Sequence, residues 1–180
     1  MTNSDLGPAR HTLAHLLAAA VLDARPDAKP TLGPAVDNGF YYDFEFTTAL
    51  TDKDLESIEA KMRDLLPAWK EFTHEEVSKE DALAKFAGNP YKEELINEIA
   101  ERGEKITLYT CGGFTDLCRG GHVENPADDI PSDSFSLSHI AGAYWRGDEK
   151  NKMLTRVYGL AFASKEELDA YKTQQEEAKK

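Results

Sequence analysis

The segment TLGPAVDNGFYYDFEF, residues 31–46, contains the strongest short-range structural pattern in the chain. Asn38-Gly39 stands between Val36 and a run of Phe and Tyr residues, and this dipeptide between apolar runs is typical of a tight β-hairpin. The segment therefore predicts two antiparallel strands joined at residues 38–39.

Helical patterns lie on both sides of this hairpin. From about Pro8 to Ala24, leucines and alanines recur at helical spacing until Pro26 ends the pattern. Thr51, followed three residues later by Asp54, resembles a capping box at the start of a second helix. The apolar stripe of this second helix continues to Trp69.

The rest of the chain is predicted to form short helices and antiparallel strands. Further helices are expected to begin at Ser78, at Asn89-Pro90 and at Ser164. The expected strands are 72–77, 106–109, 114–117, 135–145 and 153–163, with a turn at Cys111-Gly112-Gly113. No regular strand–helix–strand alternation is present, so the fold class is α+β, an antiparallel sheet with packed helices. We expect residues 1–163 to form one domain with room for two subdomains. Residues 164–180 are expected to form a C-terminal helix that begins a linker to a catalytic core.

Composition limits the class of protein. The 180 residues are 41% hydrophobic, enough for one compact domain. No apolar run approaches the roughly 20 residues of a membrane helix, no secretory signal is visible, and two cysteines cannot build a disulfide framework. These features favour the cytoplasm and no membrane partner.

The charge balance is acidic, with 21 Lys and Arg against 33 Asp and Glu and a net charge of −12. Because phosphate-binding proteins are usually basic, RNA binding would be weak or would use a small local patch. One such patch is GAYWRGDEKNKMLTRVYG, residues 142–159, where Tyr144 and Trp145 precede several cations. Aromatic residues beside cations suit stacking on unpaired bases with phosphate contacts, and a hairpin with a charged tip is the alternative. The candidates for contacts with nucleic acid are Arg146, Lys150 and Lys152.

Two pairs of residues could carry chemistry. His11 and His15 are four apart on the first helix and therefore share a face. Cys118 and His122 have the same spacing in the glycine-rich segment CRGGHV. Brought together, these four side chains could ligate zinc tetrahedrally, or they could orient a water molecule and shuttle protons. The spacing leaves both alternatives open.

Three other residues are candidates for the same site. Asp116 would share a strand face with Cys118 and could hold a substrate ammonium group, and a solvent-facing aspartate is the alternative. Lys92 lies near a helix N-terminus, where the macrodipole disfavours it, which indicates either a local role or a solvated lysine. Tyr109 is expected in the core or in a pocket wall.

Four segments in order, HTLAHLLAAAV, LGPAVDNGFYYDFE, FTDLCRGGHV and IAGAYWRGDEKNKMLTRVYGLAFASKEEL, carry a resemblance. From about His11 to Leu168 the chain resembles the editing domain, the second N-terminal domain, of bacterial threonyl-tRNA synthetases. The same four-residue cluster occurs in alanyl-tRNA synthetase editing domains and their freestanding relatives. The run AGAYWRGDEKNKML favours the threonyl branch.

The resemblance implies hydrolysis of the ester in seryl-tRNA(Thr), without aminoacylation by this chain alone. A charging site gains only about 1–3 kcal/mol from the methyl group that serine lacks, so a second, hydrolytic site is needed. The implied partners are the serine-carrying 3′ end of tRNA(Thr) and the remainder of the synthetase. The resemblance implies a site whose core is His11, His15, Cys118 and His122. Asp116 would hold the seryl amino group, and Tyr109 would line the pocket. Lys92 would position or activate the water together with His11.

No cofactor is expected, because the threonyl type is taken to work without metal. Zinc remains possible, and the same four core residues would bind it, as in the alanyl-type relatives. Gly121 stands where the family often has proline, and Cys111 is outside the core set. Because the chain shows neither a ubiquitin-like domain nor a charging core, it is expected to be an excised domain or a freestanding editor.

Three alternative functions stay open. The first is an alanyl-type, zinc-dependent trans-editor of seryl- or glycyl-tRNA(Ala). The second is a non-catalytic RNA-binding module, and the third is a zinc-stabilised structural domain.

Overall fold

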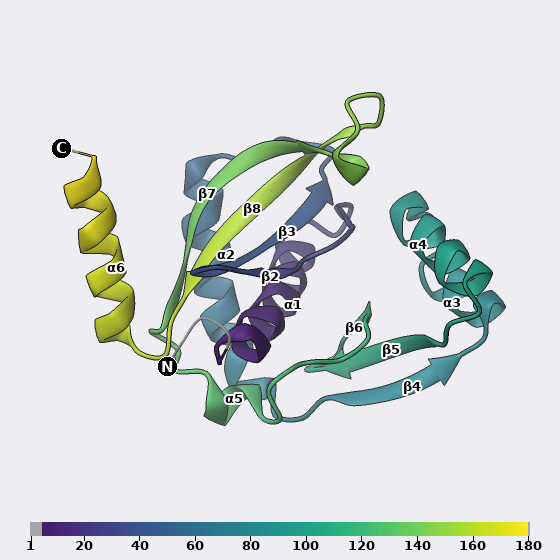
Figure 1. The fold of residues 1–180 in the computed structure, drawn as a ribbon, viewed down its shortest axis with the longest axis horizontal. Helices are drawn as coiled ribbons and strands as arrows, with labels where there is room; N and C mark the ends of the chain where they lie inside the picture. The colour runs from purple at the N-terminus through teal and green to yellow at the C-terminus, as the bar shows by residue number, and fades with distance from the viewer. Residues whose placement is uncertain (1–4, 180) are drawn as a thin grey trace.

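The structure, a computed structural model that describes residues 5–179, has two antiparallel sheets with helices packed against them (Figure 1). This confirms the α+β prediction. The helices are α1 (Gly7–Ala24), α2 (Asp52–Leu65), α3 (Lys79–Lys85), α4 (Pro90–Glu101), α5 (Pro126–Asp129) and α6 (Lys165–Ala178), with 3₁₀ turns η1 (Leu66–Ala68) and η2 (Trp145–Gly147). The strands are β1 (Lys29–Pro30), β2 (Ala35–Val36), β3 (Gly39–Glu45), β4 (Thr73–Val77), β5 (Ile106–Cys111), β6 (Phe114–Leu117), β7 (Phe135–Tyr144) and β8 (Met153–Ala161).

The main sheet has the order β1-β3-β8-β7, and β2 pairs with β3. The predicted hairpin is confirmed, because Val36 pairs with Gly39 and Asn38 adopts the positive φ of 70° that a tight turn requires. Side chains alternate along β3, so Phe40, Tyr42 and Phe44 are buried while the intervening residues face away from the core.

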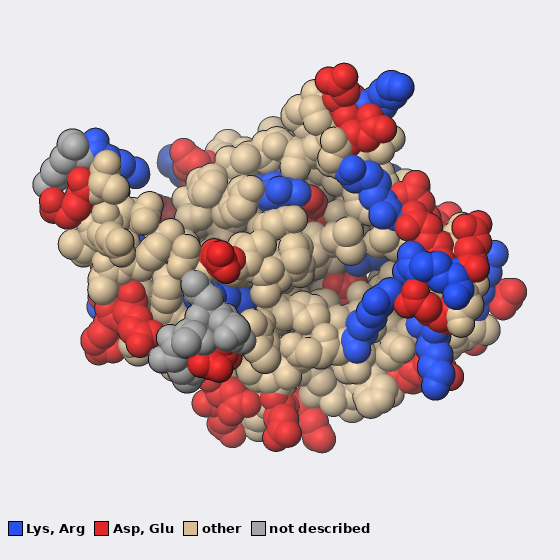
Figure 2. Space-filling view, viewed as in Figure 1, with Lys and Arg blue, Asp and Glu red and all other residues tan. Residues whose placement is uncertain are grey.

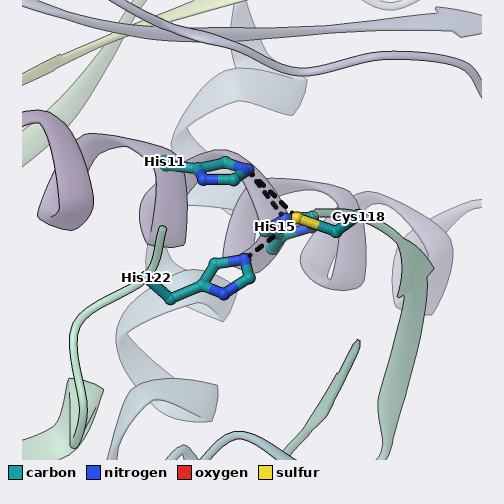
Figure 3. Close-up of side chains that lie close together, drawn as sticks. All are labelled: His11, His15, Cys118 and His122. Carbon is teal, nitrogen blue, oxygen red and sulfur yellow. Dashed lines mark hydrogen bonds between the residues drawn. The ribbon is translucent and has the colours of Figure 1, made fainter. Parts of the chain in front are cut away.

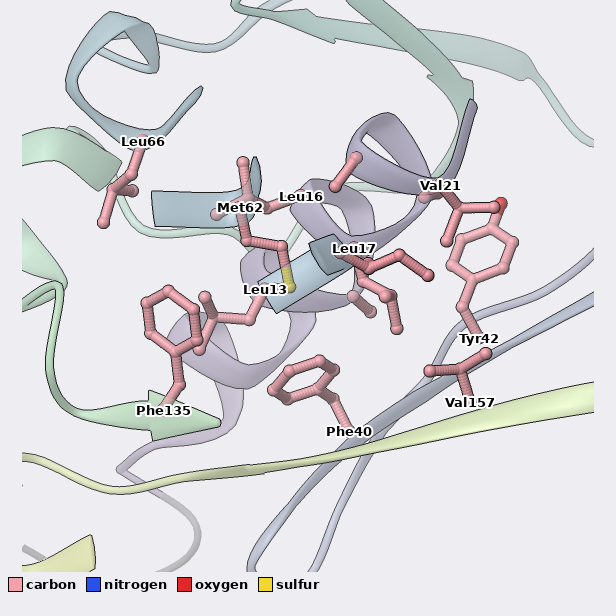
Figure 4. Packing of buried hydrophobic residues seen from close by; sticks show 14 of the residues in the cluster. Leu13, Leu16, Leu17, Val21, Phe40, Tyr42, Met62, Leu66, Phe135 and Val157 are labelled. Carbon is pink, nitrogen blue, oxygen red and sulfur yellow. The ribbon is translucent and has the colours of Figure 1, made fainter. Parts of the chain in front are cut away.

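Helix α1 is the centre of the larger core (Figure 4). Ten of its residues are buried, which is why its sequence is apolar on nearly every side rather than along one stripe. Helix α2 packs beside it through Leu55, Ile58 and Met62, and the expected capping box between Thr51 and Asp54 is present. Both helices contact the main sheet, α1 through β3 and α2 through β7.

The smaller sheet has the order β4-β5-β6 and lies beside helices α3 and α4 (Figure 1). A separate small core of Ala82, Ile96 and Ile106 holds this part together. The predicted turn is shifted by one residue: Cys111 is the last residue of β5 and pairs with Phe114. Gly112 and Gly113 make the turn, because both have positive φ values, 57° and 82°.

The helix caps lie where the sequence placed them. Ser78, Asn89 and Ser164 each accept a hydrogen bond from a backbone N–H in the first turn of α3, α4 and α6. The short helix α5, capped by Asn125, was not predicted. Within residues 5–179, none of the helices combines the length and the apolar character needed to cross a bilayer.

Candidate functional site

A cleft of about 620 Å³ lies between the two parts of the fold. Its walls come from α1, β3, α4, the end of β6 and the η2 turn, including His11, Tyr42, Lys92, Cys118 and Arg146. Figure 2 shows this face of the molecule hollowed near its centre, with Lys and Arg gathered along one edge.

The two predicted pairs meet at this cleft (Figure 3). His15 Nε2 lies 3.2 Å from His11 Nε2. The Sγ of Cys118 lies 3.5 Å from His11 Nε2 and 3.3 Å from His122 Nε2. The structure therefore places all four predicted core residues in one cluster, although α1 and the loop after β6 are far apart in sequence.

The loop that carries Cys118 and His122 is held in place by backbone conformation and by stacking. Gly120 and Gly121 have φ values of 105° and 92°, which a residue with a Cβ rarely adopts. The Val123 N–H donates to Thr12 Oγ1 on α1, and the His122 ring stacks on Phe72 with centroids 4.1 Å apart. A positive φ at Gly121 is closed to proline, so this loop differs in conformation from one with proline at that position.

Asp116 is 3% exposed and is surrounded by donors. Lys92 Nζ donates to Oδ1 at 2.7 Å, and Oδ2 lies 2.7 Å from the Tyr42 hydroxyl and 3.0 Å from His15 Nδ1. Lys92 is 1% exposed, which excludes the solvated lysine considered from sequence. The role of this lysine at a helix N-terminus is to pair with the buried carboxylate of Asp116.

Tyr42 is a site residue that the sequence analysis missed. Its hydroxyl accepts a hydrogen bond from Lys92 Nζ at 3.0 Å and donates to Asp116. The signal was its position between Phe40 and Phe44 on the buried face of β3, because a buried tyrosine hydroxyl needs a polar partner.

The buried charges shift one another's pKa values. Burial acts to raise the pKa of Asp116, but Lys92 and His15 hold it well below its usual range. Burial acts to lower the pKa of His15, but the hydrogen bonds that its ring donates to Asp116 and Cys118 raise it to about 9. Burial acts to raise the pKa of Cys118, but hydrogen bonds with His11, His122 and His15 lower it to about 4. These opposite directions favour a thiolate at Cys118 beside an imidazolium at His15.

The donor set of the cluster also fits a zinc ion. The four ligand atoms lie within 4.8 Å of one another, and the distances of 3.2, 3.3 and 3.5 Å between neighbouring ligand atoms match the edges of a tetrahedron with zinc bond lengths. Asp116 accepts a hydrogen bond from His15 Nδ1, as carboxylates usually do from the nitrogen of a metal-binding histidine that faces away from the metal, and this orients the ring. A bound zinc ion would act as a Lewis acid toward a carbonyl oxygen or a water molecule.

Tyr109 lies beside the cluster rather than within it. Its ring centroid is 5.0 Å from that of His122 and 5.0 Å from that of His74 on the neighbouring strand. A Cβ built on Gly120 would lie 2.7 Å from the Tyr109 hydroxyl, so the ring supports the loop that carries Cys118.

The predicted tRNA-contact residues lie at the tip of the β7–β8 hairpin. Trp145 is 8% exposed and donates its indole N–H to Glu94 at 2.7 Å, so the expected stacking of this ring on a base is wrong. Arg146 pairs with Glu94 and Glu98 on α4, and Lys152 pairs with Glu45 at 3.0 Å. Lys150 and Tyr144 are exposed. Arg102, Lys105 and Arg119 also line the cleft and were not predicted, and Arg102 pairs with Glu98, the same carboxylate that pairs with Arg146.

Comparisons with known proteins identify a family match and several relatives of this chain. Residues 106–158 match the family described as "Threonyl and Alanyl tRNA synthetase second additional domain". The chain is 47% identical to a threonine–tRNA ligase of Borrelia hermsii over 171 residues, which is 95% of the chain and 29% of that protein. It is 49% identical over 177 residues to one of Dehalococcoides mccartyi, covering 98% of the chain and 30% of the relative. It is 50% identical over 173 residues to one of Acidithiobacillus ferrooxidans, covering 95% and 26%.

The chain thus spans less than a third of the length of these relatives. The family match covers the strands and the loop that carry Asp116, Cys118 and His122, and the identity to the ligases extends over α1 with His11 and His15. The chain therefore belongs to the threonyl and alanyl tRNA synthetase second additional domain family, as an editing-type domain of the threonyl-tRNA synthetase kind.

Proposed function

We propose that this domain hydrolyses the ester that joins serine to the 3′ end of tRNA(Thr). The observation that carries the proposal is the convergence of His11, His15, Cys118 and His122 at the cleft, beside the buried Lys92–Asp116 pair. Such a cluster offers a proton acceptor, fixed positive charge and a thiolate within one water-accessible cleft.

In the proposed reaction a water molecule attacks the ester carbonyl carbon. His11, which lines the cleft, accepts the proton of the water. As the bond from carbon to the ribose oxygen breaks, the proton passes to that oxygen. The products are free serine and tRNA with an intact terminal ribose, and no step uses a metal.

Lys92 and Asp116 are proposed to position this chemistry. The Lys92 ammonium is held at a fixed point by Asp116 and Tyr42, where it can orient the water together with His11. Asp116 also fixes His15 through Nδ1. The expectation that Asp116 binds the seryl amino group requires that group to share or replace the contact with Lys92, since the carboxylate already accepts from three side chains.

The RNA would approach over the hairpin tip. Lys150 is exposed and lies there with Arg146 and Lys152, which are proposed to contact phosphates of the tRNA. Arg146 and Lys152 are in ion pairs with carboxylates. To bind RNA, each would exchange its carboxylate partner for a phosphate.

The test is deacylation of seryl-tRNA(Thr) and threonyl-tRNA(Thr) by the chain, with and without a strong chelator. We expect loss of serine only, at a rate that chelation leaves unchanged, and a large loss of rate in His11→Ala and Lys92→Ala. Lys53→Ala, at an exposed position of α2, is the control. Full rates in both His11→Ala and Lys92→Ala would disprove the proposal that these two residues activate and orient the water.

A second candidate function is the zinc-dependent, alanyl-type editing of seryl- or glycyl-tRNA(Ala), because the donor set fits zinc. Loss of activity on chelation, restored by zinc, with preference for tRNA(Ala) would favour this candidate over the metal-free threonyl type.

A further inference from the structure

A row of aromatic side chains crosses the main sheet on the face opposite the core. The strand register places Tyr41 of β3 opposite Tyr158 of β8, and Tyr158 opposite His139 of β7. The rings of His139 and Tyr158 are stacked, with centroids 4.4 Å apart and planes 12° apart. The centroids of Tyr41 and Tyr158 are 5.6 Å apart. His139 is exposed and the two tyrosines are half-buried, so ring surface is open to a ligand.

A β-bulge brings His139 into this row. The register shifts between Leu137 and His139, so Ser138 has no partner residue on β8. Phe135 and Leu137 pack against the core, and strict alternation would turn residue 139 to the same side. The extra residue reverses the alternation, and the histidine joins the tyrosines on the outer face.

Arg156 extends the row with a planar cation. Its guanidinium carbon lies 3.8 Å from the centroid of the Tyr41 ring. Asp43 holds the guanidinium through two hydrogen bonds, from Nε to Oδ1 at 2.8 Å and from Nη2 to Oδ2 at 3.0 Å. A guanidinium fixed in this way offers a flat face on which a base can stack.

The row begins at the wall of the cleft that holds the catalytic cluster. Tyr41, Asp43 and Arg156 line that cleft, and the row continues away from it through Tyr158 to His139. The cleft lining contains six lysines and arginines against three carboxylates, in a chain whose net charge is −12. All six cations are in ion pairs, so the phosphates of a nucleic-acid strand would bind them in exchange for carboxylates.

We propose that Tyr41, Arg156, Tyr158 and His139, named here the stacking row, bind unpaired bases of an RNA strand whose 3′ end occupies the cleft. The proposal rests on the proposed function for the direction of the strand. Sheets that display aromatic rings at paired positions are a recurrent way to bind single-stranded RNA. The row would hold the nucleotides just before the terminal one.

The first test is binding of a fluorescent single-stranded RNA of about ten nucleotides that ends in CCA and carries no amino acid. Tyr158→Leu removes the central ring and is expected to weaken binding roughly tenfold, the usual effect of losing one base–aromatic stack. Tyr158→Phe keeps the ring and is the matched control, with binding close to the unchanged chain. His139→Ala, at the exposed end of the row, tests the same surface without altering a half-buried position.

Equal binding by Tyr158→Leu, His139→Ala and the unchanged chain would overturn the proposal and leave the row as a contact for another part of a longer polypeptide. Equal loss in Tyr158→Leu and Tyr158→Phe would also overturn it, because the ring would then not be the contact. Since the probe has no ester, these results stand whether or not the domain hydrolyses seryl-tRNA.

The second test compares two substrates. The KM for seryl-tRNA(Thr) is expected to rise in Tyr158→Leu relative to the KM for a seryl ester of adenosine, which is too short to reach the row. A parallel change on both substrates would indicate a structural effect and contradict the stacking role. No hydrolysis of either substrate by the unchanged chain would contradict the proposed function and leave the binding result as the test of the row.

Discussion

The Nδ1 of His15 lies 3.0 Å from Oδ2 of Asp116, although 101 residues separate them in the chain. The same carboxylate accepts from Lys92 Nζ at 2.7 Å, and all three side chains are buried. One aspartate, on β6 of the smaller sheet, therefore connects α1 and α4 to that sheet. Its charge stabilises two cations that would otherwise be buried without a partner.

Replacement of Asp116 by Asn is expected to reduce the free energy of unfolding by about 3–5 kcal/mol, the usual cost of leaving a buried charge without its partner. Thermal or urea unfolding at pH 7 measures this. The double variant Lys92→Met with Asp116→Asn removes both charges and is expected to recover part of the loss. Strictly additive losses in the double variant would show that the Lys92–Asp116 pair contributes no coupling energy.

Alkylation of Cys118 by iodoacetamide is expected to stay fast down to about pH 5. The pKa of its thiol is lowered to about 4, since hydrogen bonds with the histidines outweigh burial, so the thiolate persists until the pH approaches 4. Cys111 is the internal control, because it is 2% exposed and burial raises its pKa to about 11. Mass spectrometry of both sites across pH checks this. A tenfold decrease per pH unit below pH 8 at Cys118 would mean an ordinary thiol.

Gly120→Ala is expected to reduce deacylation strongly, whereas Gly88→Ala is not. Both glycines have positive φ values, 105° and 88°, so each substitution costs roughly 1 kcal/mol of stability. Only at Gly120 does the new Cβ meet a side chain, the Tyr109 hydroxyl at 2.7 Å, and the loop with Cys118 must shift. Melting curves measure the cost of backbone strain in both variants, and seryl-tRNA deacylation measures the effect of moving the loop that carries Cys118. Similar rates in both would show that the position of this loop does not limit activity.

Glu45→Gln is expected to lower stability by about 1 kcal/mol above pH 5 and by progressively less at lower pH. A hydrogen bond from Tyr91, with ion pairs to Lys152 and Lys29, lowers the pKa of Glu45 from 4.5 to about 2. Because the folded-state pKa is depressed, its stabilisation is present above about pH 4.5 and is lost as the pH falls toward 2. Urea unfolding from pH 6 to pH 2.5 measures the difference, and Glu56→Gln on the exposed side of α2 is the control. A difference that is constant with pH would contradict the assigned cause.

Local patterns in the sequence were sufficient for most elements of the fold. The Asn38-Gly39 turn and the caps at Thr51, Ser78 and Ser164 depend on residues within a few positions of one another, and each lies where it was predicted. The four-residue spacing on α1 likewise places His11 and His15 on one face in any helix.

Short-range periodicity and motifs were enough to predict the element order, the α+β class and the residue types that carry the chemistry. Long-range packing determines that Cys118 contacts His11, that Lys92 is buried against Asp116 and that Tyr42 bonds to both Lys92 and Asp116. It also decided that Trp145 is buried against α4 and that a bulge turns His139 outward. These outcomes depend on how α1, the main sheet and the smaller sheet pack around one cleft, and on the strong drive of buried charges and polar groups to find partners, which no local pattern encodes.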